Sequence, residues 1–240
     1  MSALESFVTF SRPPPAPIFA SAPIDDRDST FIAYIFRVSS QSQISSSVTQ
    51  LRKVLHAKNP ASHEMHAYRL MSLKAGRDGL KGPDDFELRT GMDDDGEKYG
   101  GARILKVMEA EGVLDAVVVC SRWYGGTMLG PVRFQHIEAC TREVCRLFRT
   151  LEQVEELILT LEGLDEEIIA LRSELASLTN TASPSSSTPL SGAGAPKKQD
   201  YVASLLQPQP DLAKAQRLIR ARTGTINTLK NSIQKHSSGS

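Results

Sequence analysis

The sequence has little of several features that would point to a particular class of protein. It has three cysteines, Cys120, Cys140 and Cys145, an odd number with no CxxC spacing, so neither a disulfide framework nor a cysteine-based zinc site is expected. No apolar run approaches about 18 residues, and no basic segment followed by an apolar one opens the chain. We therefore expect the three thiols to be buried. We also expect a reducing, cytoplasmic location, although the sequence does not distinguish it from a nuclear one.

A net charge of one sign is also absent, because 28 basic side chains balance 28 acidic ones. This balance argues against a chain that coats nucleic acid or membrane along its whole length. The charges are nevertheless segregated, since residues 151–180 carry eight acidic and one basic side chain and residues 197–240 carry eight basic and two acidic ones. Opposite charge favours pairing of these two segments. We expect them to pair antiparallel within the chain, or to form a dimeric coiled coil; a solvated acidic helix and an unrelated basic tail would fit as well.

The first half of the chain shows a mixture of strand and helix patterns that predicts an α+β domain with helices on a sheet. The first 20 residues are rich in proline and are predicted to form a mobile arm. A Gly- and Asp-rich segment over 74–101 is predicted to be a long loop. Strands are predicted over 30–38, 64–73 and 114–120, and helices over 44–55, over 101–112 and from Pro131 onward.

The second half shows the heptad periodicity of a coiled coil. Apolar residues alternate at steps of three and four at Val154, Leu157, Leu161, Leu164, Ile168, Leu171, Leu175 and Leu178. A weaker repeat follows at Leu212, Ala215, Ile219, Arg222, Ile226, Leu229 and Ile233. The domains predicted are an arm at 1–20, a folded domain at 21–150, an acidic coiled-coil helix at 151–179, a flexible linker at 180–200 and a basic helical tail at 201–240.

Clustered carboxylates form the first motif that could carry chemistry. Asp94, Asp95 and Glu97 precede two glycines and a predicted helix. Such side chains could hold Mg²⁺ or act as acid and base. They are also favoured before a helix simply because they accept hydrogen bonds from its free N–H groups and complement its dipole. Capping and loop structure are the preferred interpretation, because no other kind of metal ligand lies nearby.

A second motif follows the predicted buried strand. Its members are Arg122, Trp123, Tyr124, Gly125, Gly126 and, in the next helix, Arg133. The glycines indicate a close backbone approach to another segment or to a ligand phosphate, and the arginines and aromatic side chains could form a surface for RNA or a protein. His63 and His66 are not expected to share a metal, because an odd separation places them on opposite faces of a strand.

The two motifs resemble the Impact domain family, which includes the bacterial YigZ proteins. The resemblance is carried by DDGE, GG and RIL in the first motif, and by VVVCSRWYGG, LGP and RF in the second. Asp26 to Phe31 and His63 to Arg69 agree in the same order, so the resemblance runs from about Ser21 to Phe148. It looks like the eukaryotic branch, but a proline-rich arm stands where the RWD domain of those regulators usually lies, and helices replace the ferredoxin-like domain of the bacterial relatives.

The resemblance implies a fold similar to domain 2 of ribosomal protein S5, a βαβ-type layer. It also implies that the chain binds the ribosome-associated activator of the general-control eIF2α kinase and dampens the response to amino-acid starvation. No catalytic residue, metal or cofactor is carried over. We therefore expect a non-enzymatic regulator that binds protein partners. The alternatives are an RNA- or ribosome-binding module and an uncharacterised metal-dependent enzyme.

Overall fold

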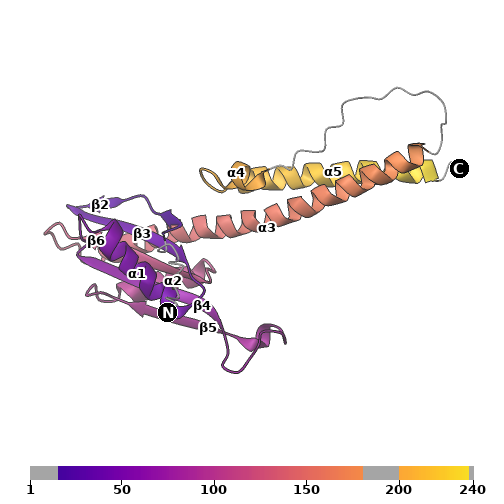
Figure 1. Ribbon diagram of the computed structural model, residues 1–240. Helices are drawn as coiled ribbons and strands as arrows, with labels where there is room; N and C mark the ends of the chain where they lie inside the picture. The colour runs from indigo at the N-terminus through magenta and orange to yellow at the C-terminus, as the bar shows by residue number, and fades with distance from the viewer. Residues whose placement is uncertain (1–15, 181–199, 238–240) are drawn as a thin grey trace, which may run out of the picture. The chain divides into compact units, whose positions relative to one another are not determined.

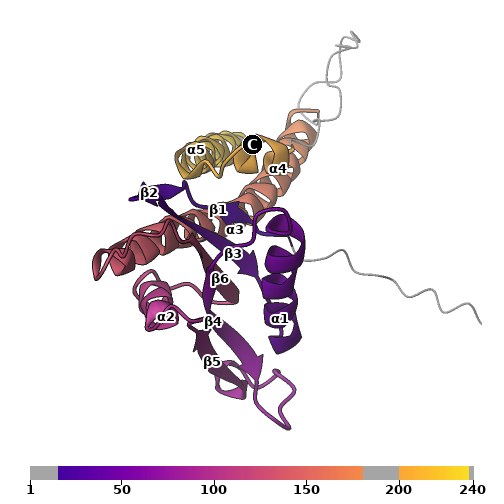
Figure 2. The ribbon, with the colours of Figure 1, turned by 90° about the vertical axis from the view of Figure 1, so that its left-hand side faces the viewer.

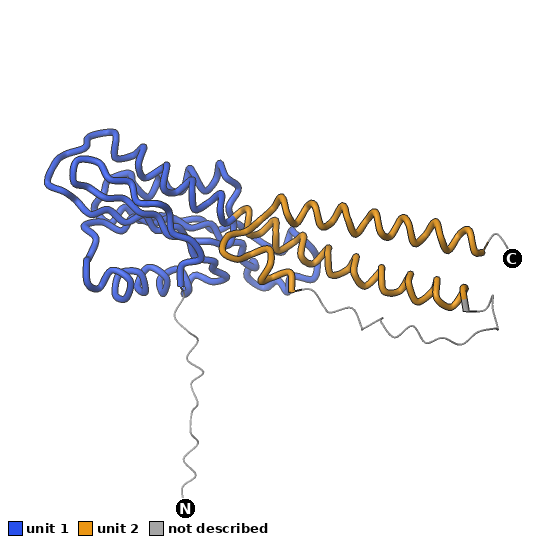
Figure 3. The backbone as a smooth tube through the Cα atoms, turned by 90° about the horizontal axis from the view of Figure 1, so that it is seen from above, with its two compact units in different colours: residues 1–148 blue, residues 149–240 orange. Residues whose placement is uncertain are grey.

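The computed structural model describes residues 16–180 and 200–237. The chain divides into two compact units, residues 1–148 and 149–240, which Figure 3 distinguishes by colour. The boundary falls within one long helix, α3, which runs from Val132 to Asn180. The first unit is an α+β domain and the second is helical, so the expected α+β class with a C-terminal helical region is confirmed.

The first unit is built on a six-stranded sheet in which every pair of neighbouring strands is antiparallel. The central order is β1-β3-β6-β4-β5, and β2 also pairs with β3. The strands are β1 (Phe19–Ala20), β2 (Ile24–Asp26), β3 (Ser29–Arg37), β4 (His63–Leu73), β5 (Phe86–Asp93) and β6 (Ala116–Trp123). Figure 1 labels β2 to β6, and Figure 2 labels β1 as well. Strands β3 and β4 both run antiparallel to β6 and are therefore parallel to each other, and the segment that connects them contains a helix, so they form a split βαβ unit with β6 between its two strands.

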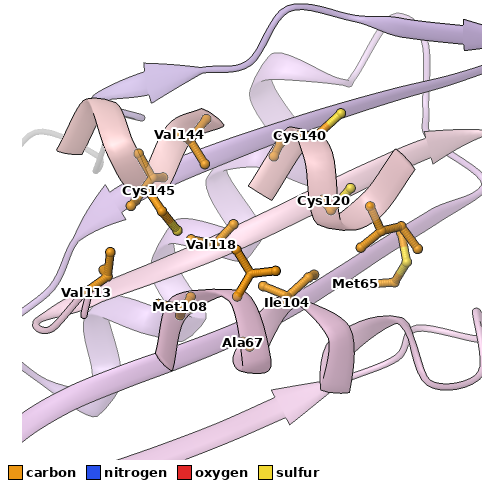
Figure 4. Close-up of a cluster of buried hydrophobic side chains, with 14 of the residues drawn as sticks. Met65, Ala67, Ile104, Met108, Val113, Val118, Cys120, Cys140, Val144 and Cys145 are labelled. Atoms are coloured by element: carbon orange, nitrogen blue, oxygen red, sulfur yellow. The ribbon is translucent and has the colours of Figure 1, made fainter. Parts of the chain in front are cut away.

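Helices cover the two faces of this sheet. Helix α1 (Gln41–Gln50), continued by a π-helical turn at Leu51–Leu55, lies on one face, and α2 (Gly100–Ala110) lies on the other (Figure 2). The first part of α3 shares the face of α2, because Cys140, Val144 and Cys145 belong to the same buried cluster as Ile104 and Met108 (Figure 4). Side chains of α1 join a second cluster with the opposite side chains of β3, β4 and β6.

The alternation of side chains along the central strands divides their buried apolar residues between these two clusters. In β6, Val118 and Cys120 face α2 and α3, whereas Val117 and Val119 face α1. All three cysteines are buried free thiols, as predicted. Burial raises the pKa of the Cys145 thiol to about 12 and that of Cys120 well above its usual range, so these thiols are protonated at neutral pH.

In the second unit, α3 packs against α4 (Tyr201–Leu206) and α5 (Leu212–Ser237). Their shared core contains Val154, Ile158 and Leu161 of α3 together with Leu205 and Ala215. Of the predicted heptad seam, Val154, Leu161 and Ile168 are buried, and Leu157, Leu164, Leu171, Leu175 and Leu178 are half-buried. The residues of this heptad repeat therefore lie on the face of α3 that is shielded from solvent.

The direction of α5 differs from the expected antiparallel pairing. Ala215 clusters with the region around Ile158, while Arg222 pairs with Asp165 at 2.6 Å and Lys230 pairs with Glu167 at 2.8 Å. Contacts therefore advance in the same direction along both helices, which run parallel. An antiparallel arrangement is typical of short connections, but the roughly 20 residues between α3 and α4 can span up to about 65 Å and so permit a return to the start of the pair.

Other boundaries also differ from the sequence-based expectation. The predicted loop over 74–101 contains strand β5, and the predicted N-terminal arm includes strand β1 at its end. Residues 1–15 of that arm, and the linker predicted over 180–200 except for its two end residues, lie outside the described residues. Among the described helices, none is long and apolar enough to cross a membrane.

Candidate functional site

The acidic motif forms the turn between β5 and α2, and Asp94 closes the start of the helix. Its Oδ2 accepts a hydrogen bond from the Tyr99 backbone N–H and its Oδ1 accepts one from Gly101, both at 2.9 Å. These amides are among those that a helix cannot satisfy internally, and the carboxylate also complements the positive end of the helix dipole. The capping interpretation is therefore confirmed for Asp94.

Asp95 contacts a different part of the domain. Its Oδ2 accepts a hydrogen bond from the Glu64 backbone N–H at 2.7 Å and lies 3.0 Å from Nη2 of Arg52. The backbone of Asp95 has a left-handed φ of 42°, a conformation that aspartate tolerates better than most residues. Asp95 therefore fastens the turn to the start of β4 and to the helical segment that precedes it.

Glu97 is buried between two arginines. Its side chain accepts a hydrogen bond from Arg122 through Oε2 and one from Nε of Arg133 through Oε1 at 2.6 Å. Glu97 is 6% exposed and Arg122 is 5% exposed. The guanidinium of Arg122 also lies 5.3 Å from the ring centres of Phe31 and Tyr124. This cluster joins the α2 turn, β6 and α3, and we call it the Glu97–arginine cluster.

Trp123 of the second motif lies on the other face of the sheet. Trp123 is the residue after Arg122 in β6, and its Nε1 donates a hydrogen bond to the Asn59 carbonyl at 3.0 Å. Its ring lies 4.8 Å from the ring of His56. Because neighbouring residues of a strand point to opposite faces, the structure does not bring Arg122 and Trp123 together as one stacking and anion-binding surface, and Arg122 is not available at the surface.

Gly125 of this motif marks a close backbone crossing, as predicted, and the partner is another segment of the chain. A Cβ atom at Gly125 would lie 2.1 Å from the carbonyl of Asp28. The Gly125 N–H donates a hydrogen bond to Oγ of Ser29 at 3.1 Å, and the backbone carbonyl of Gly126 accepts one from the Tyr124 hydroxyl at 2.7 Å. These contacts fix the end of β6 against the start of β3.

A second buried polar cluster contains residues that the sequence did not single out. Glu64, 2% exposed, accepts a hydrogen bond from Nε of Arg52 at 2.8 Å and pairs with Nδ1 of His56 at 2.7 Å. Nε2 of His56 lies 3.1 Å from the Tyr34 hydroxyl. The sequence does contain one signal for this cluster: Glu64 places a carboxylate at a position of β4 that faces α1. A charge buried there requires a partner.

The Glu64 carboxylate predicts a pH dependence of stability. Burial alone would raise its pKa, but the hydrogen bonds from His56 and Arg52 outweigh it and lower the pKa below 4.5. The stabilisation is therefore complete above about pH 4.5 and is lost as the pH falls through the folded-state value. We expect Glu64→Gln to be less stable at pH 7 and to lose less stability on acidification, as measured by urea unfolding between about pH 3 and pH 7. Equal acid slopes in the two proteins would contradict the assignment.

The two histidines of β4 have separate environments. Nδ1 of His63 lies 2.8 Å from the Asp95 carbonyl oxygen, and burial lowers the pKa of His66. They face opposite sides of the strand, as their odd separation predicted. Among the described residues, no group of three or more histidine, cysteine or acidic side chains is arranged to hold a metal ion.

Comparison with known proteins shows which family the first unit resembles. The Impact N-terminal domain matches residues 27–145. Protein IMPACT of Bos taurus is 38% identical over 130 residues, which are 53% of this chain and 37% of the relative. The Protein IMPACT homolog of Saccharomyces cerevisiae is 36% identical over 124 residues, 52% of this chain and 44% of the relative. The chain thus spans less than half the length of these relatives.

A solved structure described as the two-domain translational regulator Yih1 is 34% identical and has a TM-score of 0.34, covering 54% of this chain and 48% of its own. A second, described as a hypothetical protein, is 20% identical with a TM-score of 0.42, covering 61% and 74%. The sequence matches carry the assignment. Residues 27–145 therefore form an Impact N-terminal domain, and the matches to proteins named IMPACT support the Impact family for this domain.

Proposed function

We propose that this chain regulates translation through protein contacts and has no catalytic activity of its own. The observation that carries the proposal is the match of residues 27–145 to the Impact N-terminal domain, at 36–38% identity to proteins named IMPACT. The description of Yih1 as a translational regulator agrees with it. The finer proposal is that the chain inhibits the general-control eIF2α kinase pathway in the cytoplasm by binding the ribosome-associated activator of that kinase.

The placement of the charged motif residues supports contacts rather than chemistry. The carboxylates of Asp94, Asp95 and Glu97 each accept hydrogen bonds from backbone amides or arginines of the same unit. A catalytic acid or base needs a proton that it can exchange with a substrate, whereas these groups hold one turn in place. The motif therefore supports a rigid domain whose outer surface meets a partner.

The direct test is the phosphorylation of eIF2α in cells deprived of an amino acid. We expect production of the full chain to lower this phosphorylation and to retain the activator in affinity purifications. Residues 1–150 and residues 149–240, produced separately, show which unit carries each effect. Unchanged phosphorylation together with no retained activator would contradict the proposal.

A second candidate function is RNA or ribosome binding through α5. Arg217, Arg220 and Lys235 are exposed on this helix, and contacts of such side chains with phosphates weaken steeply as salt rises. The double substitution Arg217→Ala and Arg220→Ala should then reduce ribosome association in low-salt gradients, whereas Glu162→Ala, on the exposed part of α3, should not. Association that ignores both salt and these arginines would exclude this function.

A further inference from the structure

Strand β5 leaves one edge of the sheet unpaired. It lies at the end of the strand order and pairs with β4 along one side. In the ranges 16–180 and 200–237, no strand pairs with its other side. An edge of this kind presents a row of N–H and C=O groups that can continue the sheet with another chain.

The hydrogen-bond pattern shows which residues present those groups. The Lys74 N–H donates to the Asp85 carbonyl at 2.9 Å, in register with the β4–β5 ladder. Hydrogen-bonded and non-hydrogen-bonded pairs alternate along an antiparallel ladder. The odd-numbered residues of β5 therefore bond to β4, and the backbone groups of Phe86, Leu88, Thr90 and Met92 point outward.

The side chains of the same residues form an apolar patch. Leu88 is 44% exposed and lies opposite Met71, while Phe86 is 37% exposed and lies opposite Leu73. On the other face of the strand, Glu87 and Arg89 pair with each other at 2.7 Å. The edge thus combines free backbone groups, exposed apolar side chains and two opposite charges that lie two residues apart.

We propose that β5 pairs antiparallel with β5 of a second copy of this chain, with Leu88 opposite its symmetry mate. In this register each Glu87 lies opposite Arg89 of the other copy, and the outward backbone groups of residues 86, 88 and 90 meet. Opposite charges directly across a ladder stabilise it, and like charges destabilise it.

The other registers are less favourable. Centring the pair on Glu87 or on Arg89 places like charges opposite each other, and centring it on Thr90 places Glu87 opposite Asp93. Centring it on Gly91 pairs Arg89 with Asp93, but it leaves Phe86 and Leu88 outside the overlap. The Leu88-centred register alone combines complementary charge with contact between the apolar patches.

The first experiment measures self-association of the full chain by sedimentation equilibrium. Thr90→Pro removes an outward N–H and leaves the bonds to β4 intact, so we expect the dimer to weaken at least about tenfold. Thr90→Ala keeps that N–H and is the matched control. A wild-type chain that is monomeric at about 100 μM, or a dimer that Thr90→Pro does not weaken, would overturn the proposal; the second result would show that the dimer contact lies elsewhere than at β5.

The second experiment tests the register. All three native cysteines are buried, so an introduced surface cysteine can be followed alone. Residues of a hydrogen-bonded pair lie about 5.5 Å apart, within reach of a disulfide, and we expect Leu88→Cys to cross-link two copies under mild oxidation. Met92→Cys is the control: Met92 is more exposed, at 56%, but would lie about 27 Å from its symmetry mate.

Charge exchange provides an independent check. We expect Glu87→Arg to weaken the dimer and the double substitution Glu87→Arg with Arg89→Glu to restore it, because the exchange recreates the cross-strand pairs. Equal cross-linking of both cysteine variants, or no recovery in the double variant, would show that the copies do not pair in this register. Capture of an extended peptide by β5 in place of a second copy would equally overturn the proposal.

Discussion

Replacing Glu97 with alanine is expected to lower the free energy of unfolding of the first unit by about 3–5 kcal/mol, because it leaves a buried arginine without its counter-charge. Arg122 is 5% exposed and cannot reach water without disrupting β6. Arg133 is more accessible, with 26% of its side chain exposed. The loss therefore arises mainly at Arg122. The fluorescence of Trp123, the single tryptophan of the chain, follows this unit separately during urea unfolding.

Two further variants distinguish a buried charge from a general loss of contacts. Glu138→Ala removes a half-buried pair with Arg103, whose two side chains keep contact with water, and should cost at most about 1 kcal/mol. Replacing Glu97 with leucine and Arg122 with methionine removes both buried charges, and this pair should be less destabilised than the sum of the single changes. Simple additivity, or a cost for Glu97→Ala no larger than that for Glu138→Ala, would contradict a buried, mutually dependent pair.

The sequence predicted those elements whose pattern is strong and local. The alternation at residues 64–73 placed Met65 and Ala67 on one face and Tyr68 and Leu70 on the other, as observed. Strand β5 was missed because glycine and aspartate around it favour a loop, although Phe86, Leu88 and Met92 recur with a period of two. An edge strand with one exposed apolar face carries a weak sequence signal, because its pairing with the neighbouring strand stabilises it.

The candidate site was harder to predict because contacts between distant segments form it. Glu97, Arg122 and Arg133 were all singled out, yet only the three-dimensional structure shows them paired with one another. The partnership of Glu64 with His56 requires the turn at Pro60 to return the chain across the sheet face, which no local pattern specifies. Similarly, heptads predict which face of α3 is apolar, but the direction of its partner helix depends on where the connecting chain can reach.

Gly125→Ala is expected to lower the free energy of unfolding by about 3 kcal/mol, as a severe overpacking substitution does. The added methyl group would lie 2.1 Å from the carbonyl of Asp28, and the nearest atoms it meets are backbone. Asp28 already has a left-handed φ of 61°, so the turn between β2 and β3 has little freedom to move away. Relief would require separating the start of β3 from the end of β6, which would also break the hydrogen bond between Gly125 and Ser29.

A substitution at the neighbouring glycine distinguishes the cost of this steric clash from the cost of backbone strain. Gly126 has a φ of 86°, and a Cβ added there would meet no atom within 4 Å, so Gly126→Ala should cost only the strain of a left-handed alanine, about 1–2 kcal/mol. Urea unfolding followed by Trp123 fluorescence compares the two variants directly. If both variants lost the same stability, the start of β3 would have yielded to the added methyl group, and the close crossing of the two strands would not be what requires glycine at position 125.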